Sequence, residues 1–121
     1  MKKILVVEDE ITTRKSISKL LEDLGHIAIQ ASDGVHAVSV LEDNRDFSLV
    51  VTDMQMPNMN GEQFIYCCRE FPEYTKLPAI IISGVVRLSE ITKLMSLDNI
   101  RFMPKPIERK DLYLYVKQFL D

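Results

Sequence analysis

No apolar run in this chain approaches the roughly 20 residues that a membrane-spanning helix needs. The run from Ile4 to Val7 near the amino terminus stops at Glu8, so it is typical of a strand and too short for the apolar core of a signal peptide. Low-complexity tracts, internal repeats and blocks of like charge are also missing. We therefore expect a soluble, cytoplasmic protein.

The chain has only two cysteines and two histidines, and it has no excess of positive charge. Cys67 and Cys68 are adjacent in a predicted helix, where a disulfide would be strained, and neither has the spaced Cys and His neighbours of a zinc site. We expect reduced thiols and assign no role to His26 or His36. The formal net charge is -3, so no general field attracts this domain to nucleic acid.

What the chain does contain is the composition of a soluble globular protein, with 46% hydrophobic and 27% charged residues. A length of 121 residues suits one domain with a core of its own, without disulfides or structural metal. No stretch reads as a linker. We therefore expect one domain over residues 1–121 and no separate output domain.

Five short apolar runs predict strands, the last more weakly than the others. They are β-branched or continuously apolar rather than alternating, which is typical of strands buried on both faces of a parallel sheet. The runs are Ile4–Val7, Ile27–Ile29, Leu49–Val51, Ala79–Ile82 and Ile100–Met103.

Each run is followed by a stretch with helical character. In the first, isoleucine and leucine recur at helical spacing up to Leu24, and Gly25 ends the helix. Five βα units in succession predict an α/β doubly wound fold, a (βα)5 arrangement with a parallel five-stranded sheet and helices on both faces. The predicted helices are Thr12–Leu24, Gly34–Glu42, Gly61–Glu70, Ser89–Leu97 and Lys110–Leu120.

Polar side chains follow the strands at their carboxyl ends, where open parallel sheets bind ligands. One reading is that Glu8 and Asp9 only cap the first helix. It does not explain Asp53, whose charge directly after a buried run would be costly without a cation. We expect three carboxylates, a hydroxyl and an ammonium to converge: those of Glu8, Asp9, Asp53, Ser83 and Lys105.

A carboxylate cluster without His or Cys is a hard oxygen site of the kind that Mg²⁺ prefers. The regular alternating acidic ligands of a calcium-binding loop are missing. Mg²⁺ together with a lysine and a hydroxyl is the usual equipment for handling a phosphoryl group. The residues themselves therefore predict Mg²⁺-dependent phosphoryl chemistry.

Four segments carry a resemblance to a known family, namely Val7–Glu10, Asp53–Gly61, Ser83–Gly84 and Phe102–Pro106. In order and spacing they resemble the receiver domain of two-component response regulators, and the likeness covers the whole chain. The resemblance implies a CheY-like, flavodoxin-like sheet with strand order 2-1-3-4-5.

The resemblance also implies roles for the residues at the strand ends. Asp53 would be the phosphoacceptor, receiving its phosphoryl group from a phosphohistidine of a sensor histidine kinase or a histidine phosphotransfer protein. Lys105 would pair with the acceptor carboxylate and then with the phosphoryl oxygens. Mg²⁺ would be held by Glu8, Asp9, Asp53 and the backbone carbonyl of Gln55.

A switch is implied beside the acceptor. Ser83 matches a hydroxyl that bonds the phosphoryl group, and Phe102 matches an aromatic side chain that turns inward behind it. The family has a cis bond where this chain has Lys105-Pro106. Gln55 and Val85 occupy positions that modulate the phosphoryl lifetime. No enzyme activity is expected beyond promotion of the domain's own phosphorylation and dephosphorylation.

The output is expected to be a contact with a downstream protein through the fourth helix, fifth strand and fifth helix. The alternative for this face is an ordinary solvated surface. The residues expected there are Leu88, Lys93, Tyr113 and Lys117.

Three other functions remain as alternatives. The first is a degenerate receiver that binds a partner without phosphorylation, which the retention of the key side chains disfavours. The second is an aspartyl-nucleophile hydrolase, in which the nucleophile follows the first strand whereas Asp53 follows the third. The third is a flavin binder, which would need a phosphate loop after the first strand.

Overall fold

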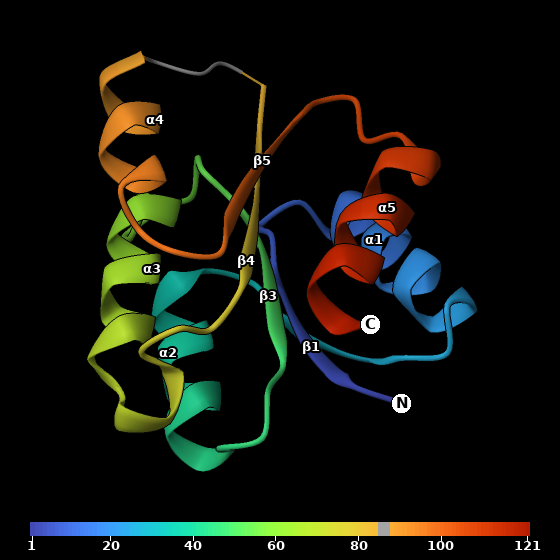
Figure 1. Cartoon of the computed structure of the whole chain (residues 1–121), viewed down its shortest axis with the longest axis horizontal. Helices are drawn as coiled ribbons and strands as arrows, with labels where there is room; N and C mark the ends of the chain where they lie inside the picture. The colour runs from blue at the N-terminus through green and yellow to red at the C-terminus, as the bar shows by residue number, and fades with distance from the viewer. Residues whose placement is uncertain (85–87) are drawn as a thin grey trace.

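The computed structural model describes residues 1–84 and 88–121 (Figure 1). Strands and helices alternate along the chain, with a short 3₁₀ helix before the fourth strand. The elements are β1 (Lys3–Val7), α1 (Ile11–Asp23), β2 (Ile27–Ala31), α2 (Gly34–Asp43), β3 (Leu49–Asp53), α3 (Gly61–Glu70), η1 (Pro72–Tyr74), β4 (Ala79–Ser83), α4 (Leu88–Met95), β5 (Ile100–Pro104) and α5 (Arg109–Leu120).

The five strands form one parallel sheet in the order β2-β1-β3-β4-β5. The predicted fold class and the strand order implied by the resemblance are both confirmed. β3 and β4 are buried along their whole length, whereas the edge strands β2 and β5 are partly exposed. The continuous apolar runs therefore belong to the centre of the sheet, where both faces are covered.

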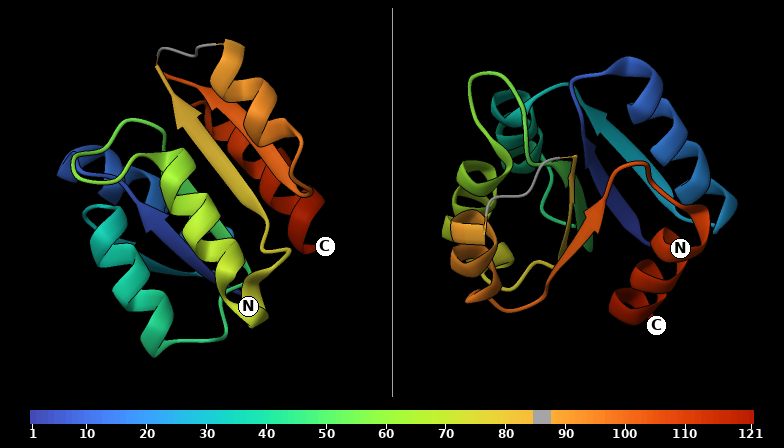
Figure 2. Two further views of the ribbon diagram at one scale, coloured as in Figure 1. Left: turned by 90° about the vertical axis from the view of Figure 1, so that its left-hand side faces the viewer. Right: turned by 90° about the horizontal axis from the view of Figure 1, so that it is seen from above.

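Helices α1 and α5 cover one face of the sheet, and α2, α3 and α4 cover the other (Figure 1, Figure 2). Successive residues of a strand point to opposite faces. In β1, Leu5 and Val7 pack into the core under α2 and α3, and Ile4 and Val6 pack into the core under α1 and α5. The chain therefore has two hydrophobic cores separated by the sheet.

Several element boundaries differ from the sequence prediction. β3 extends past Val51 to Asp53, because its ladder with β4 continues until Asp53 lies opposite Ile82. α4 ends at Met95 rather than Leu97, since the last turn tightens and Ser96 Oγ donates to the carbonyl of Lys93. No helix within residues 1–84 and 88–121 is long and apolar enough to cross a bilayer.

Candidate functional site

Three carboxylates gather at the carboxyl edge of the sheet. Oxygens of Glu8, Asp9 and Asp53 all lie within 4.8 Å of one another. Glu8 and Asp53 are 2% and 5% exposed, and Asp9 is exposed. The register explains the cluster: Val7 pairs with Thr52 across β1 and β3, so the residues that follow them emerge from the sheet as neighbours.

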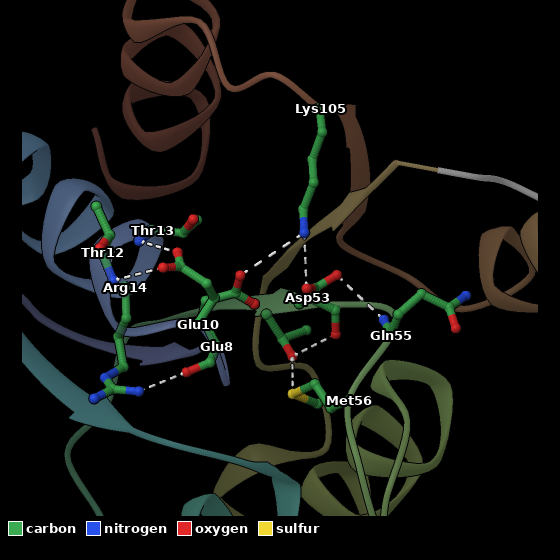
Figure 3. A network of polar contacts seen from close by, with 10 residues as sticks. Glu8, Glu10, Thr12, Thr13, Arg14, Asp53, Gln55, Met56 and Lys105 are labelled. Carbon is green, nitrogen blue, oxygen red and sulfur yellow. Dashed lines mark hydrogen bonds and ion pairs between the residues drawn. The ribbon is translucent and has the colours of Figure 1, made fainter.

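The cap of α1 is Glu10, one residue beyond the predicted acidic pair. Its carboxylate accepts hydrogen bonds from the backbone N–H groups of Thr12 at 3.1 Å and Thr13 at 2.6 Å (Figure 3). The hydrogen bond of the Thr13 side chain first, and these backbone hydrogen bonds second, lower the pKa of Glu10 to about 2. Because Glu10 caps the helix, the capping alternative does not account for Glu8 and Asp9.

Lys105 reaches the cluster from the end of β5. Its ammonium lies 2.9 Å from Asp53 Oδ2 and 3.7 Å from Glu8 Oε1 (Figure 3). The backbone N–H of Lys105 donates to the carbonyl of Ser83 at 3.0 Å, and the Lys105-Pro106 bond is cis, as the resemblance implied. Partial burial alone would lower the pKa of Lys105, but the charges and the hydrogen bond of the carboxylates outweigh it and raise the pKa.

Glu8 is the buried acid of the cluster. Among the residues that the structure describes, its Oε2 atom has no hydrogen-bond partner. Burial first, and the neighbouring Asp53 second, raise the pKa of Glu8 to about 8. An unsatisfied buried oxygen beside two further carboxylates fits a divalent cation, and an oxygen-only donor set fits Mg²⁺.

The backbone on both sides of the cluster is held by contacts that the sequence did not reveal. Arg14 Nη1 donates to the carbonyl of Glu8 at 2.8 Å, and its Nε donates to Gln30 Oε1 at 3.2 Å. The N–H of Gln55 donates to Asp53 Oδ1 at 3.2 Å. That the carbonyl of Gln55 is a metal ligand stays a prediction.

Gly61 lets α3 begin against the acceptor strand. A Cβ atom added at Gly61 would lie 2.6 Å from the carbonyl oxygen of Asp53 and 2.9 Å from Met54 Cα, closer than real Cβ contacts allow. The helix itself is started by Asn60 and Gln63, which form a capping box. A glycine at the first position of the predicted helix was the signal in the sequence for this close approach.

The two switch residues lie on neighbouring strands. Ser83 is buried at the end of β4, opposite Pro104. Phe102 is half-buried on β5 and packs against the core under α2, α3 and α4. Their roles stay predictions, and Val85 lies outside the described residues.

Some of the residues predicted to contact a downstream protein through α4, β5 and α5 already make contacts within the domain. Lys93 of α4 forms an ion pair with Glu62 of α3 at 3.0 Å, and its ammonium lies 5.5 Å from the ring centroid of Tyr66. Lys117 is exposed, whereas the Tyr113 hydroxyl accepts a hydrogen bond from Arg109 Nε at 2.8 Å. The side chain of Leu88 lies outside the described part of the chain.

Comparison with known proteins agrees with this geometry. A family model described as "Response regulator receiver domain" matches residues 4–117. A chemotaxis protein CheY homologue of Campylobacter jejuni is 31% identical over 105 residues, which cover 86% of this chain and 81% of the relative.

Two solved structures show the same fold. CheY4 of Vibrio cholerae superposes with a TM-score of 0.91 at 25% identity, covering 99% of both chains. The receiver domain of the sensor histidine kinase PA1611 of Pseudomonas aeruginosa, solved with magnesium in its active-site cleft, has a TM-score of 0.84 at 23% identity, covering 98% of this chain and 96% of that one.

Proposed function

This chain belongs to the response regulator receiver family of two-component signalling, and on that premise we propose that it accepts a phosphoryl group on Asp53 from a phosphohistidine donor. The observation that carries the proposal is the Lys105 ammonium 2.9 Å from Asp53 Oδ2, beside the carboxylates of Glu8 and Asp9. A carboxylate that lies beside an ammonium group and among carboxylates able to bind a metal ion has the surroundings that a phosphoryl acceptor needs.

In the proposed transfer, a carboxylate oxygen of Asp53 forms a bond to phosphorus while the bond from phosphorus to the donor imidazole nitrogen breaks. The electron pair of that bond stays on the imidazole. Glu8, Asp9, Asp53 and the Gln55 carbonyl would hold Mg²⁺, which would supply positive charge to offset the charge of the phosphoryl oxygens. Lys105 supplies the second positive charge and keeps the Asp53 side chain oriented.

A hollow beside Lys105 provides room for the donor. It has a volume of about 560 Å³ and is lined by residues of α1, including Thr12 and Ser16, and by Lys105, Pro106 and Ile107. Lys105, which lines the hollow, also forms the ion pair with Asp53, so the proposed donor side chain would approach the acceptor along Lys105.

The proposal extends to the output. Ser83 bonds the phosphoryl group, Phe102 turns inward, and the surface of α4, β5 and α5 changes its affinity for a downstream protein. Such a domain works in the cytoplasm as a switch and catalyses only its own phosphorylation and dephosphorylation.

The test is phosphorylation by a small acyl phosphate with Mg²⁺, followed by intact mass measurement. We expect one added phosphoryl group that hydroxylamine removes, no adduct in Asp53→Asn, and a normal adduct in the control Asp43→Asn, an exposed carboxylate of α2. An unmodified parent protein would favour the degenerate-receiver alternative.

A further inference from the structure

A groove lies between the carboxyl-terminal halves of α2 and α3. It has a volume of about 410 Å³, within the range of roughly 300–1000 Å³ that is typical of binding pockets. α2 and α3 run opposite to the strands (Figure 1, Figure 2), so their carboxyl-terminal ends, which line the groove, lie away from the carboxyl end of β3, where Asp53 is. The groove is therefore separate from the phosphoacceptor site.

The inner lining of this α2–α3 groove is apolar, and its rim is acidic. Val38, Cys67 and Phe71 are half-buried and line the interior. Glu42 and Glu70 are exposed on opposite sides, one from each helix. The groove thus combines an apolar pocket with a carboxylate on either flank.

Arg45, the cationic residue in the lining, already has partners within the domain. Arg45 Nη1 forms an ion pair with Glu73 at 2.8 Å, and the guanidinium carbon lies 5.0 Å from the ring centroid of Phe71. Within the part of the chain that the structure describes, neither Glu42 nor Glu70 forms an ion pair. The rim therefore presents negative charge that has no partner within these residues.

We propose that the α2–α3 groove docks a basic segment of a partner protein. A large apolar side chain of that segment enters between Val38, Cys67 and Phe71, and flanking lysines or arginines meet Glu42 and Glu70. Charge decides the occupant, since an acidic peptide or an anionic lipid surface would be repelled by the same rim. The docking surface shares no residue with the phosphoacceptor site.

The test uses a peptide with uncharged, capped termini and one phenylalanine flanked by lysines, which is titrated into the ¹⁵N-labelled protein. We expect chemical-shift changes centred on Val38, Cys67 and Phe71. Substitution of Glu42→Gln together with Glu70→Gln should weaken binding by about fivefold, because each exposed charge pair contributes a few tenths to 1 kcal/mol. The matched pair Glu22→Gln with Glu108→Gln removes two exposed charges elsewhere and should change affinity by less than about twofold.

Further outcomes separate the proposal from general attraction to a negatively charged protein. Replacing the phenylalanine of the peptide by alanine should weaken binding, and replacing its lysines by glutamates should abolish it. The docking proposal is overturned by no binding, by shifts spread over the whole surface, or by equal losses in the two double variants. Acyl phosphate should phosphorylate both double variants like the parent, so a failure at the groove is distinct from a failure at Asp53.

Discussion

The Lys105 ammonium and the Asp53 carboxylate form an ion pair of 2.9 Å between residues 52 positions apart in the sequence. The pair joins the carboxyl ends of β5 and β3, and it brings one positive charge to a cluster of three carboxylates. Glu8, at 3.7 Å from the same ammonium, shares that charge. The stability and the chemistry of the site therefore depend on a balance of charges.

Asp53→Asn should raise stability and abolish phosphorylation. Without metal, the substitution removes repulsion between Asp53 and its acidic neighbours, and the gain should reach the order of 1 kcal/mol above pH 8, where Glu8 is ionised. It should grow as Glu8 loses its proton toward pH 8, because repulsion in the parent then increases. Chemical denaturation at several pH values measures this, and a destabilised variant would contradict the charge-crowding argument alone.

Stability should fall as the pH rises in metal-free buffer. The pKa of Glu8 is about 8 in the folded protein against an ordinary 4.5, so between these values the folded state binds a proton that the unfolded state has released. This contribution is fully present below pH 4.5 and is lost as the pH rises through about 8. Glu8→Gln should remove it.

The parent-minus-variant difference in unfolding free energy isolates Glu8. The subtraction cancels the contribution of His26, which is the same in both proteins. The pKa of His26 is lowered, mainly by burial, so His26 changes stability with pH in the opposite direction. A difference that stays constant from pH 5 to pH 8 would show that Glu8 does not titrate there.

Mg²⁺ should stabilise the folded protein by about 2.7 kcal/mol when its concentration is about a hundred times its dissociation constant. Asp9→Asn should remove most of this gain, because Asp9 belongs to the carboxylate cluster. Asp43→Asn should keep it. The measurement is the melting temperature across a Mg²⁺ titration at fixed ionic strength, and a flat curve for the parent would count against the metal site.

Lys105→Ala should still accept phosphate but fail to switch. Mg²⁺ can support transfer, whereas the ammonium couples the phosphoryl group to Ser83 and Phe102 on the neighbouring strands. Moving a two-state equilibrium from mostly inactive to mostly active takes about 5.5 kcal/mol, so losing one charge-assisted contact is enough to weaken the shift strongly. NMR shifts near Phe102 on phosphorylation report the switch, and parent-like shifts in Lys105→Ala would refute the role.

Gly61→Ala should destabilise the protein by about 1–3 kcal/mol, because the new methyl group would meet backbone atoms of Asp53 and Met54 that cannot easily move. Gly84→Ala is the matched control. Its methyl group would lie 3.8 Å from Lys105 Cδ, so its effect should stay within about 0.5 kcal/mol. Urea denaturation of both variants measures the difference. Equal stabilities would show that the backbone between β3 and α3 shifts enough to accommodate the methyl group.

Local patterns in the sequence were sufficient for the class of fold and for the residues at each strand end. Continuous apolar runs such as Leu49–Val51 identify strands buried on both faces, because an exposed face would require alternation. A parallel sheet then brings all its strand ends to one edge. Asp53, Ser83 and Lys105 could therefore be assigned to one site without coordinates.

The tertiary structure decided what depends on contacts between distant segments. Periodicity reports only which face of an element is apolar, so it did not reveal that Glu10 rather than Glu8 or Asp9 caps α1. The raised pKa of Glu8, the Lys93–Glu62 ion pair and the α2–α3 groove arise where separate elements pack together. Burial and charge at such places are set by neighbours remote in sequence, and only packing determines which neighbours meet.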